Sequence, residues 1–159
     1  MIIRRASPGC ALASSELHDE CNSAVAISSC RMDELIVERT VDLDVDRERL
    51  WALIATPEGW RDWLVDEALL VDGAGVVVDR GVARQVRVDD VVDGRSVGFT
   101  WWEDDDPATV SHVRLTIGDD GALRIAERLL AAPRTAEARV AWEVRVCSLW
   151  ACTVAAALV

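Results

Sequence analysis

Apolar and polar positions alternate along much of the chain after residue 34, and this is the period of a half-buried β-strand. Strands are predicted at Leu35–Leu43, Gly75–Asp79, Val82–Val92, Ser96–Trp102, Ala108–Ile117 and Ala122–Leu130. Turn signals separate the later strands, namely Arg80-Gly81, Asp93-Gly94, the acidic loop Glu103–Asp106 and Asp119-Asp120-Gly121. Short connections between alternating strands indicate an antiparallel meander.

A helical period replaces the alternation between the first two of these strands. Asp44 or Asp46 can cap a helix with the sequence DRERLWALI, in which Leu50, Trp51 and Ile54 form an apolar face. The stretch Thr56-Pro57-Glu58-Gly59 interrupts it, and a second short helix is predicted over Trp60–Leu70, before the Asp72-Gly73 turn.

After Pro133 the pattern predicts one long helix, Ala136–Val159, with Thr135 as its cap. Trp142, Val146, Leu149 and Thr153 share the face that we expect to meet the sheet. The other faces are also largely apolar, which predicts that flanking loops or a second subunit cover them. A homodimer through this helix is therefore a hypothesis. Cys147 and Cys152 on the same helix are expected to be small core residues.

The order of strand, two helices, run of strands and long helix favours an α+β domain. A curved antiparallel sheet needs its apolar face covered, and the last helix has the length to do so. A sheet wrapped around one long C-terminal helix is the helix-grip arrangement. Its interior is the natural place for an apolar cavity.

Three charged residues are predicted to point inward, because alternation places them among apolar neighbours. Glu127 shares a face with Leu123, Ile125 and Leu129, Arg84 with Val82, Val86 and Val88, and Arg39 with Val37 and Val41. A buried charge is costly unless it is paired, so we expect either an Arg84–Glu127 pair or a ligand whose polar end meets one of them. A salt bridge at the rim of the sheet is the alternative.

Other candidate chemistry is sparse. His112 falls on the opposite face from Val113 and Leu115, which predicts an ordinary surface histidine. Without an inward histidine, serine or cysteine catalysis lacks its base. Trp63, Trp101 and Trp142 can line a pocket or simply fill the core. The acidic loop lacks the spacing of a calcium loop, no glycine-rich phosphate loop is present, and no metal site or cofactor is expected.

Amino-acid composition narrows the classes of molecule that the protein is expected to bind. The net charge is −11, and all 17 basic residues are arginine. Such a surface repels nucleic acid and anionic membranes. The arginine, alanine and valine bias suggests a GC-rich bacterial coding sequence. Five cysteines without a close pair favour reduced thiols in the cytoplasm. The best candidate for a membrane span, Val146–Val159, is too short.

Residues 1–31 differ from the rest because they show neither helical nor strand periodicity. We interpret them as a disordered or non-native N-terminal extension, with Met32 as an alternative start, and residues 32–159 as the domain. Neither a lipoprotein box at Cys30 nor a zinc site from Cys10, His18, Cys21 and Cys30 is well supported by the spacing.

Several motifs occur in the order found in one known family. Leu50-Trp51, Ala55-Thr56-Pro57-Glu58 and Trp63 are followed by Phe99-Thr100-Trp101, by Ala141-Trp142 and by Leu149. This pattern resembles the START-like (SRPBCC, Bet v-like) superfamily, in the branch similar to the activator of the Hsp90 ATPase. The chain departs from it at Ala141, where glycine is usual, and at Gly121-Ala122, where Gly-Thr is usual. The resemblance implies a helix-grip fold with a cavity for small hydrophobic molecules.

Three functions fit the resemblance. The favoured one is a non-catalytic carrier or sensor of a small hydrophobic ligand. The ligand-binding residues would then be Trp63, Arg84, Phe99, Trp101, Glu127, Trp142, Val146 and Leu149. The second is an enzyme of the polyketide cyclase or hydratase kind, in which Glu127 would be the acid–base group and Arg84 would stabilise an enolate. The third is a co-chaperone or interaction module.

Overall fold

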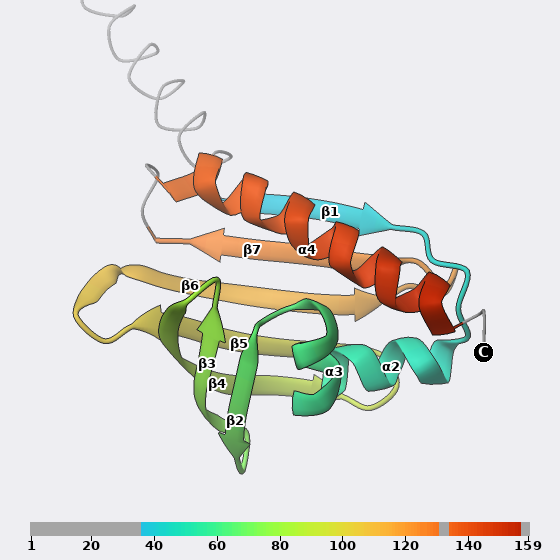
Figure 1. Cartoon of the computed structure of the whole chain (residues 1–159), viewed down its shortest axis with the longest axis horizontal. Coiled ribbons are helices and arrows are strands. Elements are labelled where there is room, and N and C mark those ends of the chain that lie inside the picture. The colour runs from blue at the N-terminus through green and yellow to red at the C-terminus, as the bar shows by residue number, and fades with distance from the viewer. Residues whose placement is uncertain (1–35, 131–133, 157–159) are drawn as a thin grey trace, which may run out of the picture. The chain divides into compact units, whose positions relative to one another are not determined.

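One antiparallel sheet of seven strands, three helices and their connections make up the described part of the chain, residues 36–130 and 134–156 of a computed structural model (Figure 1). The elements are β1 (Ile36–Val41), α2 (Arg47–Ala55), α3 (Pro57–Trp63), β2 (Glu67–Val71), β3 (Ala74–Asp79), β4 (Val82–Val92), β5 (Ser96–Glu103), β6 (Asp106–Ile117), β7 (Leu123–Leu129) and α4 (Thr135–Ala156). The predicted boundary between residues 31 and 32 lies outside the described residues.

The sheet has the order β1-β7-β6-β5-β4-β3-β2, with every neighbouring pair antiparallel. From β2 to β7 it is the predicted meander, and β1 then pairs with β7. Helix α4 lies along the inner face of the curved sheet, over β1 and β7 in Figure 1. The predicted helix-grip architecture is confirmed.

One predicted element is wrong. The second helix was expected to span Trp60–Leu70, but α3 ends at Trp63 and Glu67–Val71 forms the edge strand β2. Helical spacing of Trp60, Trp63 and Leu64 obscured a weaker alternation in the following residues. In β2 only Ala68 is fully buried, because an edge strand presents little of its surface to the core.

Local signals in the sequence explain where the elements start and turn. Asp46 caps α2 by accepting a hydrogen bond from the Arg49 backbone N–H at 2.8 Å. The Thr56 hydroxyl accepts from the Gly59 N–H at 2.9 Å and so caps α3. Both residues of the Asp72-Gly73 and Arg80-Gly81 turns have positive φ, as the tight hairpins β2–β3 and β3–β4 require.

Aromatic side chains fill much of the interior between the helices and the sheet. Trp60, Trp63, Phe99, Trp101 and Trp142 are all at most 4% exposed. The ring centroids of Trp60 and Phe99 are 4.7 Å apart, and those of Phe99 and Trp101 are 5.4 Å apart. The interior expected to hold an apolar cavity is therefore largely a packed aromatic core in this structure.

Several large apolar side chains of α4 are not covered by any other described part of the chain. Val140, Val144, Trp150 and Val154 are each at least 42% exposed, and together with Cys147 they follow one another at intervals of three or four residues. Cys147 lies among them and is exposed, so its predicted place in the core is wrong. None of the helices formed by the described residues combines the length and apolar character that crossing a bilayer requires.

Candidate functional site

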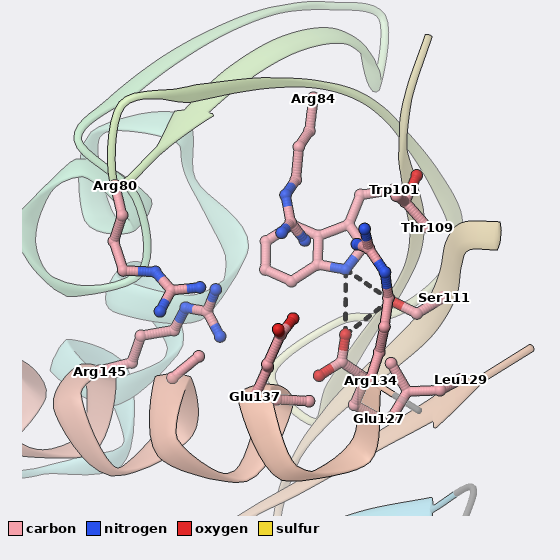
Figure 2. A pocket seen from close by; sticks show the side chains of 12 residues that line it. Arg80, Arg84, Trp101, Thr109, Ser111, Glu127, Leu129, Arg134, Glu137 and Arg145 are labelled. Carbon is pink, nitrogen blue, oxygen red and sulfur yellow. Dashed lines mark hydrogen bonds between the residues drawn. The ribbon is translucent and has the colours of Figure 1, made fainter. Parts of the chain in front are cut away.

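A cavity of about 40 Å³ lies where α4 meets strands β4 to β7, beside the indole of Trp101 (Figure 2). Arginines dominate its wall. The lining side chains are Arg80, Arg84, Trp101, Thr109, Ser111, Glu127, Leu129, Arg134, Glu137, Ala138, Ala141 and Arg145. This space holds a few atoms of the size of water, so it suits a small polar group better than a whole organic ligand.

Glu127, on β7, forms the floor of the cavity and is 3% exposed. Its Oε1 accepts hydrogen bonds from the Ser111 hydroxyl at 2.6 Å and from Trp101 Nε1 at 3.2 Å. Its Oε2 accepts from Trp142 Nε1 at 2.6 Å. Three donors from β5, β6 and α4 therefore stabilise one buried carboxylate.

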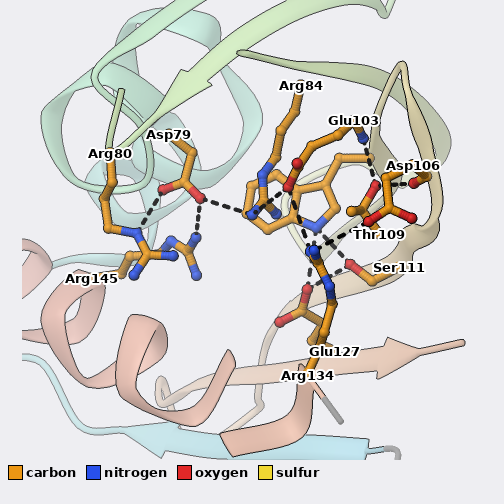
Figure 3. A network of polar contacts seen from close by, with 11 residues as sticks. Asp79, Arg80, Arg84, Glu103, Asp106, Thr109, Ser111, Glu127, Arg134 and Arg145 are labelled. Atoms are coloured by element: carbon orange, nitrogen blue, oxygen red, sulfur yellow. Dashed lines mark hydrogen bonds and ion pairs between the residues drawn. The ribbon is translucent and has the colours of Figure 1, made fainter. Parts of the chain in front are cut away.

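A second buried carboxylate, Asp79, holds the arginines on the other side of the cavity (Figure 3). Arg145 Nη2 donates to Asp79 Oδ2 at 2.7 Å, and both side chains are at most 5% exposed. Arg84 Nη2 lies 3.7 Å from the same oxygen. Arg80 Nε lies 3.6 Å from Asp79 Oδ1. One carboxylate thus fixes three guanidinium groups around the space.

Trp101 supports two of these arginines on its ring. The guanidinium carbons of Arg84 and Arg145 each lie 5.0 Å from the Trp101 ring centroid. Arg145 also lies 4.8 Å from the ring of Trp142. Cation–π contacts of this kind are stronger when the cation is removed from water, as Arg145 is here.

The outer rim of the cavity carries a further ion-pair group. Glu103 Oε1 lies 3.6 Å from Arg84 Nη2 and 3.5 Å from Arg134 Nη1. Arg134 Nη2 also lies 3.3 Å from Asp106 Oδ2. Arg134, the residue just before α4, therefore links the acidic loop to the start of that helix. Within residues 36–130 and 134–156, no group of histidine, cysteine and acidic side chains could hold a metal ion.

Two donors remain unsatisfied in this network. Arg84 Nε and Arg145 Nε are buried and have no hydrogen-bond partner within the described residues. Burial lowers the pKa of Arg145, and the nearby carboxylates Asp79 and Glu127 oppose that shift. A buried donor without an acceptor costs about 1–3 kcal/mol. The site therefore contains two buried N–H donors that a hydrogen-bond acceptor would stabilise.

The structure brings together only some of the residues predicted to form a site. Arg84, Trp101 and Glu127 line the cavity, and Trp142 reaches it indirectly through its hydrogen bond to Glu127. The other predicted ligand-binding residues pack in or against the core away from the cavity wall, and they are Trp63, Phe99, Val146 and Leu149.

The predicted Arg84–Glu127 pair is wrong. Arg84 pairs with Asp79 and Glu103, and Glu127 is held by uncharged donors. Strands β4 and β7 are separated by β5 and β6. At about 4.8 Å per strand the two backbones lie about 14 Å apart along the sheet, which favours nearer partners.

Two central residues were missed at the sequence level, and simple signals point to both. Asp79 lies two residues after the buried Val77 in β3, so the alternation of a strand places both side chains on the inward face. Arg145 lies three residues after Trp142 and four before Leu149, so it shares their helix face.

Arg39 and His112 lie outside the cavity. Arg39 is half-buried, and its Nη2 lies 2.8 Å from Glu143 Oε1 on α4. His112 is exposed on the outer face of the sheet, as predicted, and its Nδ1 lies 2.8 Å from the Thr100 hydroxyl.

The Thr100 hydroxyl also donates to Asp89 on the same outer face. Burial alone would raise the pKa of Asp89. The hydrogen bond from Thr100 and the hydrogen bond and charge of Arg87 outweigh that effect and leave the pKa below its usual value.

A larger hollow of about 370 Å³ adjoins the cavity, between α3 and α4. Arg80 and Arg145 line both spaces, so the Asp79–Arg145 pair stands between them. Four apolar residues line the hollow, Trp63, Leu64, Val65 and Val144. The other seven lining residues are polar, and they are Arg61, Asp62, Asp66, Asp79, Arg80, Arg145 and Ser148.

Solved structures with the same arrangement identify the architecture. The AHSA1 protein from Silicibacter pomeroyi is 25% identical over 73% of this chain and 95% of its own, with a TM-score of 0.59. The chain has the START-like helix-grip fold. The Aha1 dimer from Colwellia psychrerythraea is 12% identical over 74% of this chain and 95% of its own, with a TM-score of 0.59.

A further helix-grip domain with this likeness is CalU16 from Micromonospora echinospora, which is 19% identical over 72% of this chain and 71% of its own, with a TM-score of 0.55. The sequence matches no protein-family model and no curated protein. The resemblance inferred from the motifs, to the branch similar to the Hsp90 ATPase activator, is thus confirmed as a structural likeness.

Proposed function

We propose that this domain is a binding protein, a carrier or sensor of a small molecule that is mainly apolar and has a polar end. The polar end would enter the arginine-lined cavity. The apolar remainder would lie in the neighbouring hollow, against Trp63, Leu64 and Val144. Concave sites with a few placed polar groups are the usual form of small-molecule sites.

The observation that carries this proposal is that Glu127 is hydrogen-bonded through both carboxylate oxygens to the protein itself. Both oxygens of this carboxylate are engaged by donors from the protein, at 2.6 Å for Ser111 and 2.6 Å for Trp142. A general acid or base must exchange a proton with a substrate within hydrogen-bond reach. A carboxylate held in this way acts first as a structural acceptor, and that favours binding over the cyclase or hydratase function.

The experiment is native mass spectrometry of the protein purified gently from its own host. We expect a small molecule to co-purify at about one copy per chain. Addition of that molecule to stripped protein should quench the fluorescence of the buried tryptophans, because Trp101 lines the cavity. An empty protein, together with a stripped protein whose fluorescence responds to no extracted fraction, would overturn the proposal.

We also propose that the domain forms a homodimer through α4. The apolar stripe of Val140, Val144, Trp150 and Val154 is exposed in the monomer, and water-exposed apolar stripes of this length mark interaction surfaces. The helix-grip protein from Colwellia psychrerythraea is described as a dimer. Light scattering at micromolar concentration should give twice the monomer mass, and Trp150→Glu should restore the monomer. A monomeric mass for the unaltered chain would contradict this proposal.

A further inference from the structure

We propose that the polar end of the ligand is a carboxylate, bound between Arg84 and Arg145 over the face of Trp101. This inference rests on the proposed binding function and specifies the chemistry of the ligand. The position follows from geometry, because both guanidinium groups line the cavity and both lie 5.0 Å from the same ring (Figure 2).

The first argument is the demand for acceptors. The side chain of Arg145 is 5% exposed and that of Arg84 is 14% exposed, and the Nε of each has no partner within the described residues. Buried donors are almost always satisfied in folded proteins. Two orphan donors at one cavity indicate that an acceptor from outside the chain belongs there.

The second argument is that the chain's own buried carboxylates are already committed. Asp79 engages the Nη2 atoms of Arg145 and Arg84, at 2.7 Å and 3.7 Å. Glu127 accepts from Ser111 and from two tryptophans. Neither buried carboxylate makes a hydrogen bond to the Nε of Arg84 or of Arg145. Both atoms are buried, so a guest in the cavity would reach them after a small shift of these two side chains.

The third argument is shape and charge. A carboxylate is planar and small enough for a cavity of about 40 Å³, and it matches the planar fork of guanidinium. Four arginines line the space against two glutamates, and those arginines are also paired with Asp79, Glu103 and Asp106 around it. The attraction for an anion would therefore come from guanidinium donors placed at the cavity and not from a net positive charge of its surroundings.

Glu137 provides the sharpest test of ligand charge. It projects from the first turn of α4 into the same space, it is exposed, and no ion pair links it to an arginine in the described structure. An anionic guest must approach this carboxylate, so removing its charge should strengthen binding of an anion and weaken binding of a cation.

The experiment is an NMR titration of full-length protein labelled with ¹⁵N, following the Nε–H signals of arginine. The probes are sodium acetate and, at matched ionic strength, methylammonium chloride. We expect acetate to shift two Nε–H signals saturably, and we expect methylammonium to shift neither. Arg84→Lys keeps the positive charge but removes one orphan Nε, and it should weaken acetate binding about tenfold.

Glu137→Gln should tighten acetate binding about twofold to fivefold, the size of a surface charge effect. Glu67→Gln makes the same charge change on β2, outside the cavity wall, and should leave binding unchanged. Glu137 is exposed, so this variant tests the proposal even if Arg84→Lys folds poorly.

Two results would overturn the proposal that the polar end of the ligand is a carboxylate. One is acetate binding that Glu137→Gln does not tighten or that Arg84→Lys does not weaken. The other is a neutral or cationic molecule that co-purifies and leaves both Nε–H signals unmoved, which would leave the binding function intact. If no molecule co-purifies and acetate shifts no signal, both the proposed binding function and the proposed carboxylate chemistry of the ligand are refuted.

Discussion

Replacing Glu127 by glutamine tests whether the buried carboxylate holds the sheet and helix α4 together. The carboxylate accepts from Ser111, Trp101 and Trp142, with the first and last of these contacts at 2.6 Å. A glutamine amide has one acceptor oxygen and one NH₂ group, which only donates. If the amide oxygen of the glutamine accepts the hydrogen bonds from Ser111 and Trp101, the NH₂ group faces the indole N–H of Trp142. Two donors then face each other and neither has an acceptor.

The size of the effect follows from these contacts. A hydrogen bond to a charged group contributes about 1.5–3 kcal/mol, and an orphaned buried donor costs about 1–3 kcal/mol. We therefore expect Glu127→Gln to lower the free energy of unfolding by about 2–4 kcal/mol. Ser111→Ala removes one donor to Glu127 and also the acceptor that Trp101 Nε1 meets at 2.6 Å, while both tryptophan bonds to Glu127 remain, so it should cost about 1–2 kcal/mol.

The assay is equilibrium unfolding in urea at pH 7, followed by tryptophan fluorescence and by circular dichroism in parallel. Coincident transitions establish that a single free energy applies to the domain. Glu38→Gln, on the exposed side of β1, makes the same chemical change outside the network and should stay within about 0.5 kcal/mol of the original protein. A loss below about 1 kcal/mol for Glu127→Gln would refute the reasoning.

Three further predictions follow from contacts elsewhere in the domain. A Cβ at Gly59 would lie 2.3 Å from the Ala52 carbonyl oxygen, so Gly59→Ala should force α2 and α3 apart and lower the free energy of unfolding, measured in urea, by about 1–3 kcal/mol. Burial raises the pKa of Cys152 whereas Cys147 is exposed in the single chain, so iodoacetamide at pH 8 should label Cys147 before Cys152 in a peptide map of the monomeric Trp150→Glu variant; equal rates would contradict this. The folded-state pKa of Asp89 is lowered, so its contribution to stability is present above about pH 4 and is lost as the pH falls through that pKa. Asp89→Asn should therefore lower the free energy of unfolding in urea at pH 7, and this effect should shrink as the pH is lowered below about 4; an effect that does not change with pH would be inconsistent with this linkage.

The sequence predicted the sheet and the long helix because their periods are strong and uninterrupted. In β6 buried and non-buried positions alternate from Val110 to Ile117, as the apolar pattern indicated. The edge strand β2 was mistaken for helix because its side chains contact the core at few positions. Tertiary pairing with β3 decides its conformation, and no local pattern records that pairing.

The candidate site was only half predictable for a different reason. Alternation identified Arg84 and Glu127 as inward, and both line the cavity. Their partners depend on strand order and on which helix face meets the sheet, and single-strand patterns carry neither. The size of the interior also escaped prediction, because five buried aromatic rings fill it and only packing in three dimensions shows what space remains.

The hydrogen bonds of Glu127 also bear on how the chain is made. Glu127, the acceptor, lies on β7, and its three donors lie on β5, β6 and α4. The ribosome therefore synthesises the carboxylate and two of the donors before it reaches Trp142. Until α4 emerges, the nascent sheet has an uncovered apolar face and an incompletely satisfied charge. Such intermediates are prone to association. Folding of this domain during synthesis should therefore stop short of the native state until helix α4 has left the ribosome.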